Sequence, residues 1–277
     1  MKNQQLKYLL YATLLDSYQD YLDYDKIFNE YYGNSEILPF TCEEFGEIKR
    51  SELIDRINRV PMKWEDSEKA DRGTAFNIVI DYLISGEKPE KGIIENIYAN
   101  PETYFDSNIG DGYDGKGVVA YKITYNNRTF IFPISICREF ADYYEGAVPQ
   151  AYTEAILPTK YGDVKLYGNI DELMPSSVHD IKTTVKYSTG KFKNHWQSVA
   201  YPYCLNASGN EVHDFEYNIL LISSRASGDT YETFTEHYNY VPEVDVPRLT
   251  AHVESLIEFI EANKDSISDL KIFNKHE

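Results

Sequence analysis

Two short segments in the second half of the chain carry carboxylates and an amine at the spacing of β-strands. The first ends on Asp171, and the second is the triplet Asp180, Ile181 and Lys182. Residues i and i+2 of a strand share a face, so we expect Asp180 and Lys182 to project together while Ile181 points into the core. Two buried carboxylates repel each other unless a positive charge compensates them. If Asp171 lies opposite on the neighbouring strand, this pattern predicts a site for a divalent metal ion.

A short basic stretch follows this pattern in an otherwise acidic chain. The formal net charge is -18, which argues against broad, nonspecific coating of nucleic acid. Between positions 176 and 200, however, Asp180 is the one acidic residue, and four lysines are present: Lys182, Lys186, Lys191 and Lys193. A local strip of this kind predicts contacts with a phosphate backbone. Lysines on an ordinary solvated face are the competing interpretation.

The elements expected to hold these residues are helices in the first hundred positions and a sheet in the second half. A capping box from Thr41 to Glu44 predicts the start of one helix. Asn126 and Asn127 predict the turn of a hairpin. Further helices are expected at about 70–84, 191–206 and 244–262, and strands at 118–125, 128–134, 152–157, 164–173, 178–185, 212–224 and 230–240.

The apolar segment at positions 6–15 is similar in composition to a secretory signal. It is interrupted by Lys7, is followed by several aspartates and lacks a small-residue cleavage site, so we expect an amphipathic surface helix there. No apolar segment is long enough to span a membrane. The three cysteines, Cys42, Cys137 and Cys204, are far apart, which favours free thiols in a reducing compartment. These features predict a cytoplasmic protein without a membrane partner.

The order of the elements predicts an α/β fold, with a mixed central β-sheet flanked by helices, a helical N-terminal region and an inserted hairpin. We expect one domain over residues 1–277. Within it, residues 1–69 form the helical N-terminal region, residues 70–240 form the core with an insertion at about 100–134, and residues 241–277 form a C-terminal helical region.

Four short motifs follow one another within positions 70–225. They are Arg72-Gly73-Thr74, Gly168-x-x-Asp171, Asp180-x-Lys182-Thr183 and Gln197-x-x-x-Tyr201. With these motifs in this order, the chain resembles the PD-(D/E)XK nuclease superfamily, and more narrowly its RecB-type and Cas4-type exonuclease branch, which includes phage and recombination nucleases. The resemblance implies a restriction-endonuclease-like core. Three cysteines are too few for the four-cysteine iron–sulfur cluster of Cas4-type relatives, and no P-loop signature indicates a linked helicase.

The resemblance also implies the chemistry of the site. Asp171, Asp180 and the backbone carbonyl of Ile181 would hold Mg²⁺ or Mn²⁺, because hard oxygen donors suit these ions. Lys182 would position or deprotonate the attacking water and stabilise charge at the phosphate. Glu154, on the preceding strand, is either a second-metal ligand or an edge-strand charge.

Two helices would complete the site. Many relatives carry a metal-binding histidine at the position of Asn77, whose neutral oxygen is a weaker ligand. Asp81, one turn later, is a candidate to compensate for it. Gln197 and Tyr201 are one helical turn apart and would bind the DNA end or brace the site. Pro202 predicts a kink beside Tyr201 that would disturb this pair.

The function implied by the resemblance is a Mg²⁺-dependent deoxyribonuclease, in particular an exonuclease acting on linear duplex ends in recombination, repair or phage DNA processing. Lys186, Lys191 and Lys193 would contact the DNA. A recombinase or single-strand annealing protein is a candidate partner, and ring-forming relatives suggest an oligomer. Two alternatives stay open. One is a catalytically weak or inactive module that binds nucleic acid or protein, and the other is a restriction-type endonuclease whose insertion at about 100–134 reads the DNA sequence.

Overall fold

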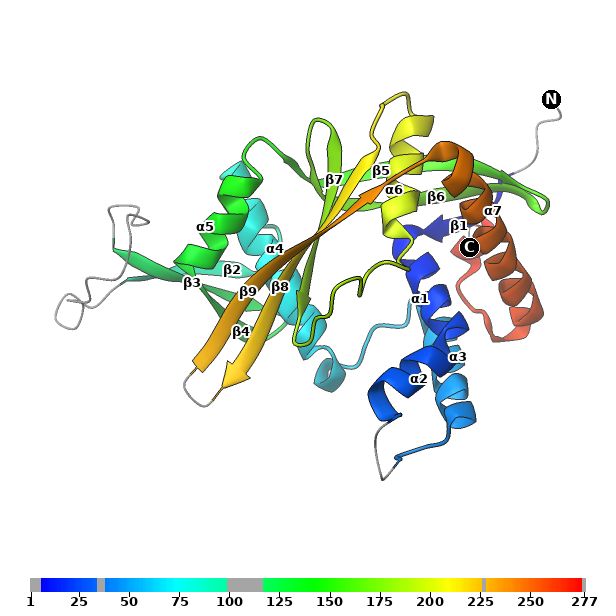
Figure 1. Ribbon diagram of the computed structural model, residues 1–277, viewed down its shortest axis with the longest axis horizontal. Helices are drawn as coiled ribbons and strands as arrows, with labels where there is room; N and C mark the ends of the chain where they lie inside the picture. Colours follow the sequence, from blue (N-terminus) through cyan, green and yellow to red (C-terminus); the bar gives the residue numbers. More distant parts are fainter. Residues whose placement is uncertain (1–5, 34–37, 99–116, 226–227, 276–277) are drawn as a thin grey trace.

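The chain forms a mixed α/β fold in which helices cover both faces of a central sheet (Figure 1). The computed structural model describes residues 6–33, 38–98, 117–225 and 228–275. Its strands are β1 (Leu6–Tyr11), β2 (Ile93–Tyr98), β3 (Val118–Tyr125), β4 (Arg128–Pro133), β5 (Val148–Thr159), β6 (Gly162–Leu173), β7 (Ser177–Thr184), β8 (Asp214–Arg225) and β9 (Gly228–Asn239). Its α-helices are α1 (Ala12–Leu22), α2 (Tyr24–Tyr32), α3 (Cys42–Ile57), α4 (Glu68–Ser85), α5 (Ile134–Tyr143), α6 (Gln197–Ala207) and α7 (Pro242–Ala262). Among the described residues, no helix combines the length and apolar content needed to cross a membrane.

The central sheet mixes parallel and antiparallel strands. Its main path runs β1-β6-β7-β8-β9, and β5 pairs with β6 as an antiparallel hairpin. The β1–β6 and β7–β8 pairs are parallel, whereas β6–β7 and β8–β9 are antiparallel. A separate antiparallel sheet has the order β2-β3-β4. The predicted α/β class with a mixed central sheet is therefore confirmed.

The N-terminal segment differs from the surface helix predicted for positions 6–15. Leu6–Tyr11 is a strand, β1, which pairs in parallel with residues 163–167 of β6 before α1 begins. Leu10 and Leu15 are fully buried. β2 is a second strand in the region that was expected to be helical. The prediction was wrong because a short apolar run fits a strand or a helix equally well, and here the edge of β6 decides between them.

One edge of β6 is left open over four residues. On that edge β1 pairs with residues 163–167, and β7 pairs only with Glu172 and Leu173. In the described part of the chain, residues 168–171 have no strand partner on this edge, and they are the Gly-Asn-Ile-Asp segment. Asp171 and Asp180 would form the next pair of the β6–β7 register, but the two strands separate there. The backbone N–H and C=O groups of residues 168–171 that face this edge therefore have no partner strand.

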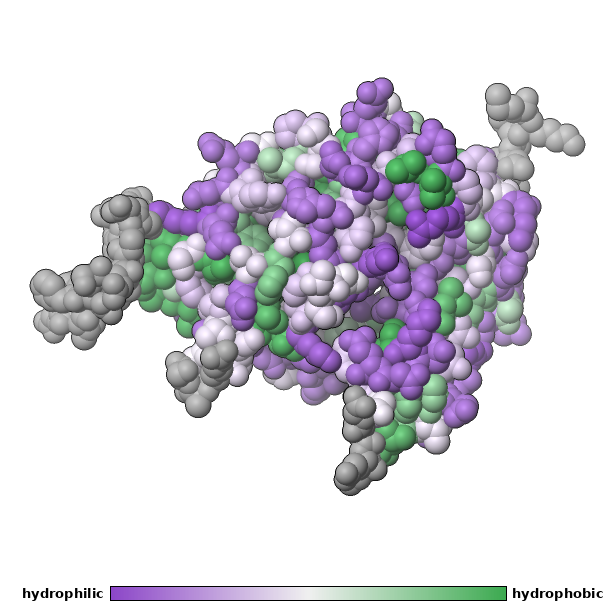
Figure 2. Space-filling model, viewed as in Figure 1, coloured by the Kyte–Doolittle hydropathy of each residue, from purple (hydrophilic) through white to green (hydrophobic). Residues whose placement is uncertain are grey.

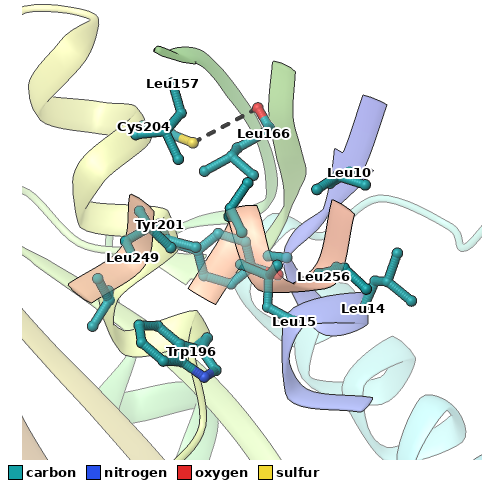
Figure 3. Close-up of a cluster of buried hydrophobic side chains, with 14 of the residues drawn as sticks. Leu10, Leu14, Leu15, Leu157, Leu166, Trp196, Tyr201, Cys204, Leu249 and Leu256 are labelled. Carbon is teal, nitrogen blue, oxygen red and sulfur yellow. Dashed lines mark hydrogen bonds between the residues drawn. The ribbon is translucent and has the colours of Figure 1, made fainter. Parts of the chain in front are cut away.

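The larger of two hydrophobic cores lies between one face of the sheet and helices α1, α6 and α7. Figure 3 shows side chains of these helices packed against Leu157 of β5 and Leu166 of β6. The Cys204 thiol of α6 points at the carbonyl of Leu166 (3.8 Å). This packing holds the first turn of α6 against the strands that carry the predicted site.

The opposite face of the sheet carries the second core. Ile181 of β7 packs there with Phe76 of α4, with α5 and with the small sheet. Helix α4 approaches β7 closely, since a Cβ on Gly73 would lie 2.8 Å from Oγ1 of Thr183. The described part of the predicted insertion forms β3 and β4 within this core, and positions 99–116 lie outside the described residues.

Local sequence signals predicted two element ends correctly. Thr41 caps α3 in a capping box: Glu44 N donates to Thr41 Oγ1, and Thr41 N donates to the Glu44 carboxylate. Asn126 and Asn127 form the β3–β4 turn with φ of 48° and 59°. Asparagine tolerates this left-handed region better than most residues, so the hairpin was readable from the sequence.

Candidate functional site

A cavity of about 1050 Å³ opens beside the unpaired segment of β6. Its walls come from β6, β7, α4, α6 and the residues that follow α4. It is lined by most of the residues that the sequence predicted for the site: Asn77, Asp81, Asp171, Asp180, Ile181, Lys182, Gln197 and Tyr201. These residues come from four separate elements, so the fold gathers them in one place.

Asp171 and Asp180 lie where β6 and β7 separate. Asp171 Oδ2 accepts a hydrogen bond from the backbone N–H of Ile181 (2.9 Å), in place of a ladder bond. Burial raises the pKa of Asp171, and the neighbouring carboxyl of Asp180 raises it further. The structure thus brings the two carboxyls together in a buried position, where a cation would offset their repulsion.

Lys182 projects on the same side of β7 as Asp180, as strand alternation predicts. Its Nζ lies 2.7 Å from Asp180 Oδ2 and donates to Gln197 Oε1 (2.7 Å). Burial lowers the pKa of Lys182, but the carboxylates of Asp180 and Asp171 outweigh burial and raise the pKa overall. In this arrangement the amine therefore holds its proton and supplies a positive charge and hydrogen-bond donors.

Helix α6 places two further predicted residues in the site. The helix expected from position 191 begins only at Gln197, whose Nε2 donates to Asp180 Oδ1 (2.6 Å) and to Tyr201 OH (3.3 Å). The helix continues through Pro202, and the contact between Gln197 and Tyr201 is kept. The predicted disturbance of this pair by Pro202 was therefore wrong. Gln197 links the amine, one carboxylate and the tyrosine in a single hydrogen-bonded group.

Helix α4 brings Asn77 and Asp81 to another wall of the cavity. Asn77 Oδ1 is buried and has no hydrogen-bond partner among the described residues. Asp81 lies against Glu172, a fully buried residue next to Asp171 in the chain. Burial raises the pKa of both carboxyls, and the Asp81 carboxyl raises that of Glu172 further. The unpartnered oxygen of Asn77 and the Asp81 carboxyl thus line the same cavity as the two aspartates.

The chemistry of the donors fits Mg²⁺ or Mn²⁺. In the described ranges, no group of three or more His, Cys, Asp or Glu side chains is arranged to hold a metal ion. The donors at hand are hard oxygens, namely the two aspartate carboxylates and the carbonyl of Ile181, which points to the same strand edge as its N–H. Mg²⁺ commonly binds through one or two carboxylates and keeps several waters. The unpartnered Oδ1 of Asn77 adds one more oxygen of the same kind.

Glu154 does not belong to this group. Its side chain is 43% exposed on β5, and its carboxylate accepts from Tyr152 OH (2.6 Å) and Lys165 Nζ (2.9 Å). The β5–β6 register pairs Glu154 with Tyr167, outside the open segment of β6. The geometry of Glu154 therefore favours the second of its two predicted roles, an edge-strand charge, over a second-metal ligand.

The predicted basic strip is divided among three places, and Lys182 lines the first cavity. Lys186 and Lys191 line a second cavity of about 490 Å³, together with Arg72 and the unpredicted Lys69 of α4. Lys193 instead lines a small pocket beside α6 and α7. Because α6 begins only at position 197, these lysines lie outside any helix and share no helix face.

No sequence signal identified Asp16 of α1 as a neighbour of the site. Its Oδ1 accepts a hydrogen bond from Trp196 N at the start of α6, and its Oδ2 lies 3.7 Å from His195 Nδ1. Burial raises the pKa of Asp16 to about 7, while the ammonium of Lys182 opposes the shift. The pairing of β1 with β6 is what brings α1 to this position, and the sequence did not predict that pairing.

Comparison with known proteins assigns no family to the chain. No protein-family model matches it, and no curated protein matches it. It is similar to a solved structure titled "Crystal structure of SSO0001", with 14% sequence identity and a TM-score of 0.32. The match covers 45% of this chain and 53% of that one, so the chain spans about half the length of that structure.

Proposed function

We propose that this protein is a Mg²⁺- or Mn²⁺-dependent deoxyribonuclease that hydrolyses phosphodiester bonds. One observation carries the proposal: Asp171, Asp180 and Lys182 meet at the open edge of β6, beside a cavity of about 1050 Å³. Two carboxylates, a protonated amine and space for a nucleotide are what metal-assisted phosphodiester hydrolysis needs. The resemblance of the ordered motifs to RecB-type exonucleases, with their restriction-endonuclease-like core, supports the same reaction.

In this proposal Asp171, Asp180 and the carbonyl of Ile181 would hold the ion. When bound, the ion supplies positive charge that polarises the scissile phosphate and lowers the pKa of a coordinated water. Lys182 would donate to a phosphate oxygen as negative charge develops there. Because its amine holds a proton, charge stabilisation fits Lys182 better than service as the base that deprotonates water.

Gln197 and Tyr201 would act as positioning residues. The side-chain amide of Gln197 bonds both to Lys182 and to Asp180, and core packing of α6 fixes the amide in turn. Held in this way, the amine and the carboxylate keep one relative orientation before the substrate arrives. Such preorganisation supplies a large part of the rate in phosphoryl transfer.

The resemblance, rather than the site geometry, supports the finer parts of the proposal. Linear duplex ends would be the substrate, as for the similar exonucleases. Recombination, repair or phage DNA processing would be the setting, and a recombinase or single-strand annealing protein would be the partner.

Incubation of the pure protein with linear and covalently closed DNA, in Mg²⁺ or Mn²⁺, tests the proposal. We expect degradation of the linear form alone. Degradation of neither form with either ion would contradict the catalytic claim, and cleavage of the closed form would indicate an endonuclease.

Lys182→Ala adds a test of the assigned role. The variant should cleave at least about 100-fold more slowly and keep its fold, because the amine lies at a polar strand face. Lys165→Ala, on the neighbouring strand outside the cavity, is the matched control and should cleave as the parent does. A Lys182→Ala protein that fails to fold would show that the lysine is structural.

A catalytically weak or inactive nucleic-acid-binding module is the second candidate. Asn77 favours it, because a neutral amide stands where the similar nucleases carry a metal-binding histidine. Calorimetric titration with Mn²⁺ distinguishes the two candidates. Binding by the parent that is lost in Asp180→Ala supports the nuclease, whereas negligible binding by both proteins supports the second candidate. A restriction-type endonuclease has less support, since the described part of the insertion is packed in the second core.

A further inference from the structure

A second cavity lies directly beside the first. It has a volume of about 490 Å³ and is lined by the end of β7, the turn that follows, the start of α4 and Tyr31 of α2. Lys69 and Thr183 line both cavities. The two cavities therefore adjoin where α4 packs against β7. Figure 2 shows a hollow bordered by hydrophilic residues near the middle of the view, between the N-terminal helices and the long β8–β9 hairpin.

The second cavity is basic although the protein is acidic. Lys69, Arg72, Lys186 and Lys191 line it, and Glu68 is the one carboxylate among its lining residues. That carboxylate lies 3.5 Å from Arg72, which leaves the three lysines uncompensated within the lining. In a chain with 45 acidic and 27 basic side chains, composition alone does not explain such a cluster. A cavity lined by positively charged side chains attracts an anionic ligand.

Lys191 is held in place by neutral groups. Its Nζ donates to Thr184 Oγ1 (2.7 Å) and to the backbone carbonyl of Lys186 (2.7 Å). Burial lowers the pKa of Lys191, and the carboxylate of Glu30 opposes the shift without cancelling it. An ammonium has three donors, and these bonds use two of them. The third donor is available to a phosphate.

Tyr31 adds an aromatic ring to the rim of the cavity. The side chain is 56% exposed, and Lys186 Nζ lies 5.2 Å from the centroid of its ring. Exposed rings next to cations bind single-stranded nucleic acid, because the ring stacks on a base while the cation contacts the backbone. A volume of about 490 Å³ suits one nucleotide.

We propose that the second cavity binds one unpaired nucleotide of the substrate strand, with its phosphate at Lys186 and Lys191 and its base on Tyr31. The inference rests on the proposed nuclease function, since it adds a subsite for the strand that the first cavity would cleave. The strand would pass over Thr183 between the cavities, next to Lys69. The protein would therefore hold DNA in single-stranded form beside the site of hydrolysis.

Oligonucleotide binding is measured in EDTA, which removes the metal ion that hydrolysis would need, so that binding at this subsite is tested without cleavage. The probe is a short fluorescent thymidine oligonucleotide. Lys186→Gln/Lys191→Gln should bind it more weakly, and the slope of log affinity against log salt should fall by about 0.7, because the two lysines neutralise one single-strand phosphate. Lys165→Gln is the control, since Lys165 lines neither cavity, and it should bind as the parent does.

A second pair of variants tests the aromatic contact. Tyr31→Ala should weaken binding of the oligonucleotide about fivefold or more, whereas Tyr31→Phe keeps the ring and should bind as the parent does. Equal binding by Tyr31→Ala and the parent would overturn the assignment of the base to this ring.

The remaining outcomes also decide the proposal. Unchanged binding by the double lysine variant would overturn it, and so would an equal loss in Lys165→Gln, which would reflect net charge alone. A duplex that binds with the same dependence on Lys186 and Lys191 would overturn the single-strand assignment. Displacement of the probe by inorganic phosphate as readily as by unlabelled oligonucleotide would show a free-anion site. If the parent protein cleaves no DNA with Mg²⁺ or Mn²⁺ but the variants still differ from it in binding, the proposed nuclease function is wrong and the nucleotide-binding site is supported.

Discussion

A methyl group on Gly168 would lie 2.8 Å from Cε1 of Tyr201, closer than a Cβ approaches other atoms in folded proteins. Gly168 is the first residue of the open segment of β6, and Tyr201 is buried on α6. Glycine at this position lets α6 pack against the open edge, and this packing brings Gln197 to Asp180. The Gly-x-x-Asp spacing of the motif thus has a packing cause as well as a chemical one.

Gly168→Ala should lower the melting temperature and the cleavage rate together. The methyl group displaces the Tyr201 ring, and overpacking of a core typically costs about 1–3 kcal/mol. Tyr201→Leu makes room for the methyl group, so a double-mutant cycle should give a coupling free energy of at least about 0.5 kcal/mol. Purely additive losses of stability in thermal or denaturant unfolding would contradict the contact.

Asp171→Asn should raise stability in EDTA and abolish stabilisation by metal. The amide oxygen can still accept from the Ile181 N–H, while one of two repelling carboxylates is removed. At a hundredfold excess of Mn²⁺ over its Kd, the parent should gain about 2.7 kcal/mol of unfolding free energy.

Thermal unfolding with and without Mn²⁺ measures both effects. Asp163→Asn, near the start of the same strand, is the control and should keep the response to metal. Equal stabilisation of Asp171→Asn and the parent by Mn²⁺ would remove Asp171 from the ligand set.

The unfolding free energy should depend on pH through Asp16. Burial raises the pKa of this carboxyl from 3.8 to about 7. Between these values the folded state keeps a proton that the unfolded state has released. The contribution of Asp16 to stability is therefore fully present below about pH 4 and falls as the pH rises toward 7, by at most about 1.4 kcal/mol per pH unit.

Asp16→Asn isolates this effect. The amide oxygen can still accept from Trp196 N, but it does not titrate. Denaturant unfolding of both proteins at pH 5, 6 and 7 should show the variant gaining stability relative to the parent as the pH rises. A constant difference across this range would mean that Asp16 titrates normally.

Glu154→Gln should leave cleavage and Mn²⁺ affinity unchanged. The carboxylate lies on the exposed face of β5 beside Lys165, so its loss should change stability by less than about 1 kcal/mol. The resemblance allowed Glu154 as a second-metal ligand. If Glu154 had that role, the Glu154→Gln variant would cleave DNA clearly more slowly than the parent. Cleavage assays of Glu154→Gln next to Asp171→Asn decide between the two assignments.

The features that could be predicted from the amino-acid sequence are those that depend on near neighbours in the chain. Strand alternation placed Asp180 and Lys182 on one face, and the capping box at Thr41 and the turn at Asn126 formed as predicted. Each of these features is set within a few residues, by backbone geometry and local hydrogen bonds. The α/β class followed from the order of such elements.

Only the tertiary structure decided which distant residues share the cavity. β1 pairs with β6 and carries Asp16 to the start of α6, while the β5–β6 register keeps Glu154 away from the site. Lys191 and Lys193, two residues apart in the chain, line different cavities. Strand pairing and helix packing depend on contacts between segments far apart in sequence, and a local pattern such as the apolar run at 6–15 is compatible with more than one of them.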